Sequence, residues 1–250
     1  MDASLLTSLF RLADGSLVLA QRLSEWCGHG PVLEEDIALS NLALDYLGQA
    51  RLLYSHIGVL EDCGRDEDAL AYFRDVNDFV NPTLVELPNG DFGQTVLRTF
   101  FYACWQAALW NGVMQSKDST LAAIAEKSRK ETRYHVEHLA GWVVRLGDGT
   151  EESHRRMQRA LALLYPYAQE LFEDDAVDAA AHAARLLPLP SSLQDAWRSN
   201  VLPVLAEATL EVPADTPFRS TGRRGVHSEH LGYVLAEMQS LARAHPGASW

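Results

Sequence analysis

Helical patterns follow one another along nearly the whole chain, and this succession constrains the fold more than any other feature of the sequence. Apolar residues recur at helical spacing, whereas runs of alternating Val, Ile and Thr are missing. The Asn89-Gly90 pair, which could join two strands, is followed by a helical pattern. A chain without strands buries its apolar faces by packing helix on helix. The sequence therefore predicts an all-α protein.

Start and stop signals give the expected helix bounds. We predict helices over residues 17–26, 34–60, 66–74, 92–115, 119–146, 150–172, from 191 onward, and over 226–245. Asp14-Gly15-Ser16 is interpreted as the start of the first helix and Ser191-x-x-Gln194 as a capping box. Residues 81–91 and 213–225 are expected to be loops. The expected organisation is one domain, 1–250, with an antiparallel core bundle of four long helices over about 15–147 and accessory helices over about 149–250.

Charge and composition exclude several classes of protein. The net charge of −13 argues against nucleic-acid binding, which needs a basic surface. We find no apolar run as long as a membrane span, and the N-terminus lacks the pattern of a signal peptide, so we expect no membrane association. Three cysteines without C-x-x-C spacing fit a reducing cytoplasm. The expected location is therefore cytoplasmic.

The stretch KETRYHVEHLAGW, residues 130–142, raises the question of a metal site within such a bundle. Ferritin-like bundles hold two irons with a Glu from each of two helices and a Glu-x-x-His pair from each of the other two. The i, i+3 spacing places both members of a pair on one helix face. A di-iron site would therefore require these ligands on the four long helices.

The first two long helices contain few candidate metal ligands. Glu25 could be the first ligand, although it could equally be an ordinary glutamate at a helix end. The second helix contains no Glu-x-x-His, and Tyr46 and Gln49 stand at that spacing instead. Asn41, Asp45 and Gln49 are four residues apart, so we expect them to form a line of side chains that hydrogen bond to another helix.

The last two long helices depart further from the iron-binding pattern. Between residues 92 and 117 there is no Asp or Glu, and the neutral amide of Gln106 is a poor iron ligand. In the fourth helix His135 is predicted to point inward, but Thr132 stands where its glutamate partner is required. Glu131 is one position away and four residues from His135. The sequence therefore argues against a functional di-iron site.

Four long segments carry a family resemblance. They are LSEWCGHGPVLEEDIALSNLALDYLGQAR, KETRYHVEH, VVRLGDGTEESHRRMQ and GVHSEHLGYVLAEMQ. Together they resemble the PaaC-type structural subunits of bacterial phenylacetyl-CoA 1,2-epoxidases, which are multicomponent monooxygenases with a ferritin-like fold. The resemblance covers nearly the whole chain.

This resemblance implies a ferritin-like four-helix bundle with additional C-terminal helices and a non-catalytic role in aerobic phenylacetate degradation. It implies that a paralogous catalytic subunit holds the di-iron centre, that a small subunit bridges such pairs, and that a reductase component delivers electrons. It places the former metal pairs at Tyr46 and Gln49 and at Thr132 and His135. This chain is then expected to hold no cofactor and no catalytic residue of its own.

Two further clusters invite other hypotheses. The segment from His227 to His230 repeats the His-x-Glu-His form of His135 to His138, and two such pairs could suggest zinc, but a helix start or a contact with a partner fits the second pair better. Arg219, Arg223 and Arg224 form a local basic cluster that could meet the phosphates of CoA or an acidic partner, or could simply be a solvated loop.

The leading hypothesis is a structural subunit of the epoxidase. The alternatives are an autonomous ferritin-like metal-binding oxidase and a stand-alone helical oligomer.

Overall fold

The computed structural model describes residues 2–248, and the prediction of an all-α fold is confirmed. No strand is present among these residues. The fold is that of the ferritin-like class, and the chain divides into two compact units. Unit 1 comprises Met1–Pro88 and Thr221–Trp250, and unit 2 comprises Asn89–Ser220.

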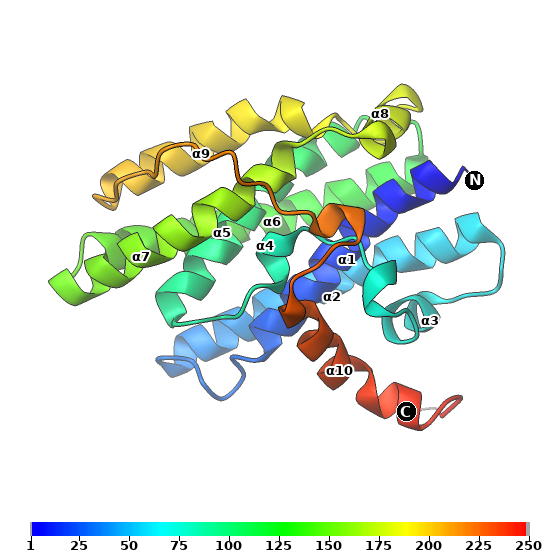
Figure 1. Ribbon diagram of the computed structural model, residues 1–250, viewed down its shortest axis with the longest axis horizontal. Coiled ribbons are helices and arrows are strands. Elements are labelled where there is room, and N and C mark those ends of the chain that lie inside the picture. The colour runs from blue at the N-terminus through cyan, green and yellow to red at the C-terminus, as the bar shows by residue number, and fades with distance from the viewer. Residues whose placement is uncertain (1, 249–250) are drawn as a thin grey trace. The chain divides into compact units, whose positions relative to one another are not determined.

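Unit 1 is built on a pair of long helices that pack along each other (Figure 1). Its elements are α1 (Ala3–Ser24), α2 (Leu33–Glu61), α3 (Glu67–Tyr72), the 3-10 turn η1 (Val76–Asp78), α4 (Thr83–Glu86), η4 (Gly222–Arg224) and α10 (Glu229–Ala244). The last helix contacts α1, α3 and α4. The end of the chain therefore returns to the unit in which the chain began.

Helix α1 begins much earlier than predicted. Asp2 caps it by accepting from the backbone N–H of Ser4 at 2.8 Å, and the helix runs through Asp14-Gly15-Ser16 without a break. These three residues are buried. The predicted helix start there was wrong, because Asp14 binds partners from other elements instead of capping its own helix.

The length and apolar composition of α1 would suit a membrane span, contrary to the sequence prediction that no run is long enough. Its most apolar window has a mean hydropathy of 1.3, but 67% of that window is buried inside the protein. Such burial is what a core helix of a folded domain shows.

Unit 2 contains the second long pair, in which α5 packs along α6 (Figure 1). Its elements are α5 (Phe92–Val113), α6 (Ser119–Gly147), α7 (Glu151–Ala168), η2 (Gln169–Phe172), α8 (Ala176–Ala183), η3 (Pro190–Leu193) and α9 (Gln194–Glu207). Asp91, Asp118 and Thr150 cap α5, α6 and α7 with their side chains. Helix α5 is buried along most of its length and forms the core of this unit.

Two local predictions in the connecting segments were wrong, and one helix was not predicted. The expected loop 81–91 contains α4, whose four residues are buried. The expected capping box at Ser191 is absent: Ser191 instead binds Asp174, with its Oγ 2.6 Å from Oδ2, and a 3-10 turn precedes α9. Helix α8 was not predicted. Burial of α4 and the contact of Ser191 with Asp174 outweigh the local patterns there, whereas α8 begins at a local capping box formed by Asp175 and Asp178.

Candidate functional site

The second-helix positions of the former metal site lie on α2. Tyr46 and Gln49 are both fully buried, whereas Asp45 is half-buried. Asn41 is exposed, so the predicted line of three buried polar side chains was wrong at that end. The buried pair consists of a phenol and an amide, and neither group carries the negative charge that balances ferrous or ferric iron.

Glu25 is the helix-end glutamate that the simpler interpretation expected. It is the exposed C-cap of α1, and its Oε1 accepts from Arg22 Nη1 at 2.8 Å. The same arginine donates from Nε and Nη2 to the carbonyl oxygen of Glu86, at 3.1 and 2.7 Å. Glu25 therefore contributes to the surface at the end of a helix.

His135 on α6 is buried as predicted, and Thr132 is buried beside it, so these positions offer a single imidazole. His135 and Thr132 are completely buried. Glu131 is half-buried and forms an ion pair with Lys127 of the preceding turn. The hydroxyls of Ser128 and Thr132 have no hydrogen-bond partner among residues 2–248. Hydroxyls are weak neutral ligands, so they do not replace the missing carboxylate.

The donor set does not fit a di-iron centre. Helix α5 carries no Asp or Glu, and its central Gln106 is a buried amide. Within residues 2–248 no three His, Cys, Asp or Glu side chains lie close enough together to hold a metal ion. Two irons need roughly six ligands, most of them carboxylates. We therefore derive no chemistry of this chain through iron.

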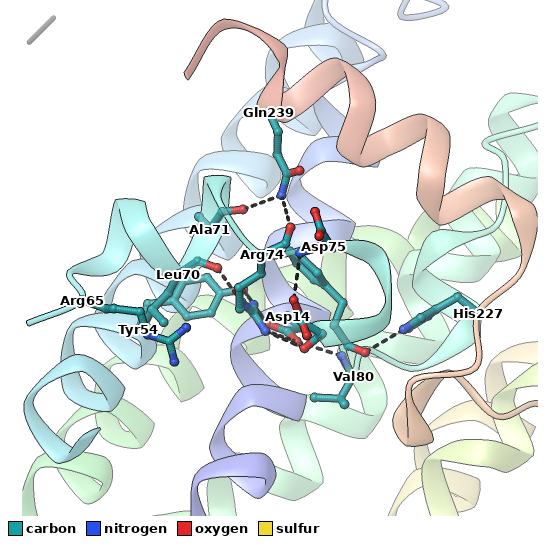
Figure 2. A network of polar contacts seen from close by, with 12 residues as sticks. Asp14, Tyr54, Arg65, Leu70, Ala71, Arg74, Asp75, Val80, His227 and Gln239 are labelled. Carbon is teal, nitrogen blue, oxygen red and sulfur yellow. Dashed lines mark hydrogen bonds and ion pairs between the residues drawn. The ribbon is translucent and has the colours of Figure 1, made fainter. Parts of the chain in front are cut away.

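A buried ionic network forms the most elaborate polar site of unit 1 (Figure 2). Asp14 of α1 accepts two bonds from the guanidinium of Arg74, one from Tyr54 Oη at 2.6 Å and one from the backbone N–H of Val80 at 2.9 Å. Arg74 also donates to the carbonyl oxygens of Leu70 and Asp78, at 2.6 and 2.9 Å. One carboxylate thereby joins α1, α2 and the segment that follows α3.

Aromatic rings complete the surroundings of Arg74. Its guanidinium carbon lies 4.2 Å from the ring centre of Phe79 and 4.6 Å from that of Phe10. Burial, the largest single effect, would lower the pKa of Arg74, but the charges and hydrogen bonds of Asp14 and Tyr54 together outweigh it and raise the pKa. Burial, followed by the Asp14 charge, raises the pKa of Tyr54 well above its ordinary value. The network is therefore a fixed ion pair with a neutral phenol.

Sequence reasoning missed this network, although a signal was present. Asp14 stands in the apolar stretch LFRLADGSLVLA, and a charge within a helix that is apolar on most sides needs a buried partner. The identity of that partner could not be read from the sequence, because Arg74 lies sixty residues away.

The pair predicted as a possible zinc site is a helix start. Ser228 caps α10, and His227, just before it, is buried against Glu86. Nδ1 of His227 lies 2.7 Å from Glu86 Oε2, and Nε2 lies 2.7 Å from the carbonyl oxygen of Phe79. Both nitrogens face acceptors, so both are satisfied only when the ring carries two protons. Burial alone would lower the pKa of His227, but the hydrogen bond and charge of Glu86 raise it above the ordinary value.

The three arginines of the predicted basic cluster do not share one environment. Arg223 is only 8% exposed, so little of its side chain is available to a phosphate or a partner. Its carbonyl oxygen accepts from Arg11 Nε at 3.0 Å, inside unit 1. Arg219 and Arg224 are exposed, and Arg219 lies 3.4 Å from a carboxylate oxygen of Glu173.

In unit 2, other basic side chains line a groove of about 680 Å³ between α5, α6 and α9. Arg129, Lys130 and Arg133 line it, but Lys130 pairs with Glu126 at 3.6 Å and Arg133 with Glu137 at 3.0 Å. The surplus of positive charge is thus small, and exposed pairs of this kind contribute little energy. The groove therefore lacks the unpaired positive charge that an anion-binding site needs.

Comparison with known proteins identifies the family of the chain. The chain matches the protein family described as phenylacetic acid catabolic protein along residues 1–250. A relative from Escherichia coli (strain K12), the component of 1,2-phenylacetyl-CoA epoxidase that is designated C, is 47% identical over 240 residues, which are 96% of each of the two chains. The similarity therefore extends across both units.

Proposed function

The chain belongs to the family of phenylacetic acid catabolic proteins, and from this premise we propose that it is a non-catalytic subunit of a phenylacetyl-CoA epoxidase. It works within a multisubunit complex in phenylacetate degradation. The observation that carries the non-catalytic role is the donor set of α2, α5 and α6: buried Tyr46, Gln49, Thr132 and His135, and no carboxylate along α5.

The partners follow from the same proposal. A paralogous catalytic subunit holds the di-iron centre and binds the CoA thioester, a small subunit bridges such pairs, and a reductase supplies electrons. This chain itself binds no cofactor. Its contribution is a rigid helical surface, because the ion pair of Asp14 and Arg74 fixes how α1 and α2 pack against the segment after α3. We expect the complex to act in the cytoplasm.

Elemental analysis tests this proposal directly. The chain purified alone from cells grown with added iron is expected to contain negligible iron, and it should neither consume oxygen nor form product with phenylacetyl-CoA and an electron donor. Mixing it with the catalytic subunit and the reductase should yield the epoxide. The catalytic subunit, loaded in the same cells, serves as the positive control for iron incorporation. About two irons per isolated chain, as in other members of the ferritin-like class, would contradict the proposal.

The exposed arginines admit a narrower test within this proposal. Arg224→Glu and Arg219→Glu reverse charge without disturbing the core, whereas Arg223 is buried and unsuitable. If these positions contact CoA phosphates, the apparent affinity of the assembled complex for the thioester should fall while assembly is unchanged. A loss of assembly alone would assign these arginines to an interface between subunits. If neither affinity nor assembly changes, the arginines belong to a solvated loop without a binding role.

A further inference from the structure

The end of the chain packs on the rest of unit 1 with a small apolar contact. We call residues 221–248 the C-terminal segment, which contains η4 and α10. Of the 16 residues of α10, those that are buried are Leu231, Val234, Leu235 and Gln239. Three apolar side chains bury little surface compared with the conformational entropy that is lost when a helix of this length is fixed. Polar contacts therefore decide whether the C-terminal segment stays in place.

Glu86 of α4 holds the start of α10. Its side chain is completely buried, and both carboxylate oxygens accept hydrogen bonds. Oε1 lies 2.6 Å from the backbone nitrogen of Ser228, and Oε2 lies 2.7 Å from Nδ1 of His227. Nδ2 of Asn81 donates to Oε2 at 2.9 Å. A buried carboxylate needs such donors, and two of these three belong to the C-terminal segment.

A second point of contact lies farther along α10. Nε2 of Gln239 donates to the carbonyl oxygens of Ala71 and Arg74, at 3.1 and 3.0 Å, and Nη2 of Arg243 donates to that of Arg74 at 2.8 Å. An amide is neutral and a guanidinium is permanently charged, so neither donor loses a proton near neutral pH. A change of pH therefore acts at the Glu86 end of the segment.

One peptide group links His227 to the ionic network around Asp14 (Figure 2). The carbonyl oxygen of Phe79 lies 2.7 Å from Nε2 of His227. The N–H of Val80, which belongs to the same peptide group, donates to Oδ2 of Asp14 at 2.9 Å. This group is trans, so its two bonds point in opposite directions. A cation at the carbonyl end and an anion at the N–H end therefore polarise it in the same sense and strengthen each other's contact.

Two carboxylates face the ring of His227. Glu86 on α4 is in direct contact, and Asp14 on α1 acts through its charge. Other charged groups on the surrounding elements are Arg22, Arg74, Asp75, Asp78, Arg224 and Glu229. Arg74 pairs with Asp14, and Arg22 donates to the carbonyl oxygen of Glu86. A second proton on His227 thus balances the buried charge of Glu86.

We propose that His227 is a pH-sensitive latch: with two protons on its ring it holds the C-terminal segment against the rest of unit 1, and with one proton it releases that segment while the rest of the unit stays folded. When the second proton passes to water, the ring has one N–H for two acceptors. Either Glu86 or the carbonyl of Phe79 then faces a lone pair at hydrogen-bond distance. The side chain of His227 is only 2% exposed, so water cannot replace the lost bond and the ring must move away.

Release is expected as the pH rises. Burial alone would lower the pKa of His227, but the hydrogen bond and charge of Glu86 raise it above the ordinary value of about 6.5. The latch is therefore fully closed below about pH 6.5, and it opens as the pH rises through the folded pKa. Each unit between the folded and the open pKa raises the opening constant of the segment about tenfold. This inference goes beyond the proposed function, because it concerns a motion within this chain alone.

Hydrogen exchange of the full chain measures this release. Mass spectrometry of peptides from α10, from about pH 6 to about pH 9 with labelling times scaled to the intrinsic exchange rate, gives the opening constant of the helix. We expect this constant to rise about threefold or more across the range, while that of α2 peptides changes less.

Two histidine variants test whether His227 is the group responsible. The neutral amide in His227→Gln should raise the opening constant already at about pH 6 and remove its dependence on pH. His230→Gln is the matched control, since His230 lies on the same segment and its side chain is half-buried away from Glu86. It should retain the pH dependence of the wild type.

Several outcomes would overturn the latch. An opening constant of α10 that does not change with pH in the wild type would do so, and this result needs no variant to fold. An equal increase in α2 and α10 would show a loss of stability of the whole unit and would refute a local release. A pH dependence that persists in His227→Gln, or that disappears in His230→Gln, would assign the effect to another group. Iron content and activity, on which the proposed function depends, do not enter these outcomes.

Discussion

Asp14 sits in the middle of an apolar helix, shielded from water, so neighbouring groups must balance its charge. Arg74, Tyr54 and the backbone of Val80 do so together. The side chain of Gln239 then donates to the carbonyl oxygens of Ala71 and Arg74, at 3.1 and 3.0 Å, which ties α10 to the same region (Figure 2). At the scale of single residues, unit 1 is held by a few buried polar contacts between segments far apart in the chain.

Removing the charge of Asp14 is expected to be severe. Asp14→Asn leaves the buried guanidinium of Arg74 without its counterion, and breaking a buried pair in this way costs about 3–5 kcal/mol. The free energy of unfolding from urea titration should fall by that amount, whereas Asp215→Asn, in an exposed loop, should change it by less than about 0.5 kcal/mol. Because the two residues are coupled, Asp14→Asn combined with Arg74→Met should cost less than the sum of the single changes. Additive effects would contradict the coupling.

His227 should make the stability of the chain depend on pH. Burial alone would lower the pKa of His227, but the hydrogen bond and charge of Glu86, with smaller contributions from the Phe79 carbonyl and Asp14, together raise the pKa above the ordinary value. A group with a raised folded pKa stabilises fully below its unfolded pKa, about 6.5 for histidine, and loses this contribution as pH rises through the folded pKa. The urea midpoint of the wild type should therefore fall as the pH rises above about 6.5. His227→Gln should show a flatter dependence over the same range, and an equal slope in both proteins would assign the effect to other groups.

At the scale of elements, α2 shows how position decides what a glycine does. Gly48 faces open space, whereas a Cβ at Gly58 would lie 2.4 Å from the carbonyl oxygen of Arg65. The first glycine leaves room outside the helix, and the second lets the chain after α2 pass close to it. The same helix therefore contains two glycines with different physical reasons for being small.

Alanine at these two positions should have opposite effects. Gly48→Ala gains helix propensity without a clash and should stabilise the chain by about 0.5–1 kcal/mol. Gly58→Ala must displace backbone and should destabilise it by about 1–3 kcal/mol. Thermal unfolding of the two variants, which differ only in position along one helix, measures the contrast. Stabilisation by Gly58→Ala would show that residue 65 shifts readily.

At the scale of the whole molecule, the chain retains the ferritin-like helices without the ligands that the class uses for iron. Both long pairs are well packed, and their stability comes from apolar cores and buried hydrogen bonds such as that from Trp197 Nε1 to the carbonyl oxygen of Phe101, at 2.9 Å. The missing carboxylates remove the need for a metal to neutralise buried charge. Folding should therefore be independent of iron.

Iron and chelators should leave the stability unchanged. A metal that binds only the folded state at 100 times its Kd adds about 2.7 kcal/mol to the free energy of unfolding. Under the proposal that this chain binds no metal, the thermal midpoint should be the same after chelator treatment and in excess ferrous iron under anaerobic conditions. The purified catalytic subunit is the positive control, since its thermal midpoint should rise with iron and fall after chelator treatment. A rise of several degrees in this chain would reveal a metal site that its donor set does not predict.

The amino-acid sequence by itself determined the all-α class, the bounds of α2, α5 and α6, and the scarcity of candidate metal ligands along these helices, because helical periodicity, capping residues and residue identity are local properties. The burial of His135 followed from periodicity in the same way. Only the tertiary structure decided that Asp14 pairs with Arg74, that His227 binds Glu86, and that Arg223 is buried while Arg224 is exposed. It also showed that one face of α2 remains uncovered. These features depend on which distant segments meet, and no local pattern of residues specifies that meeting.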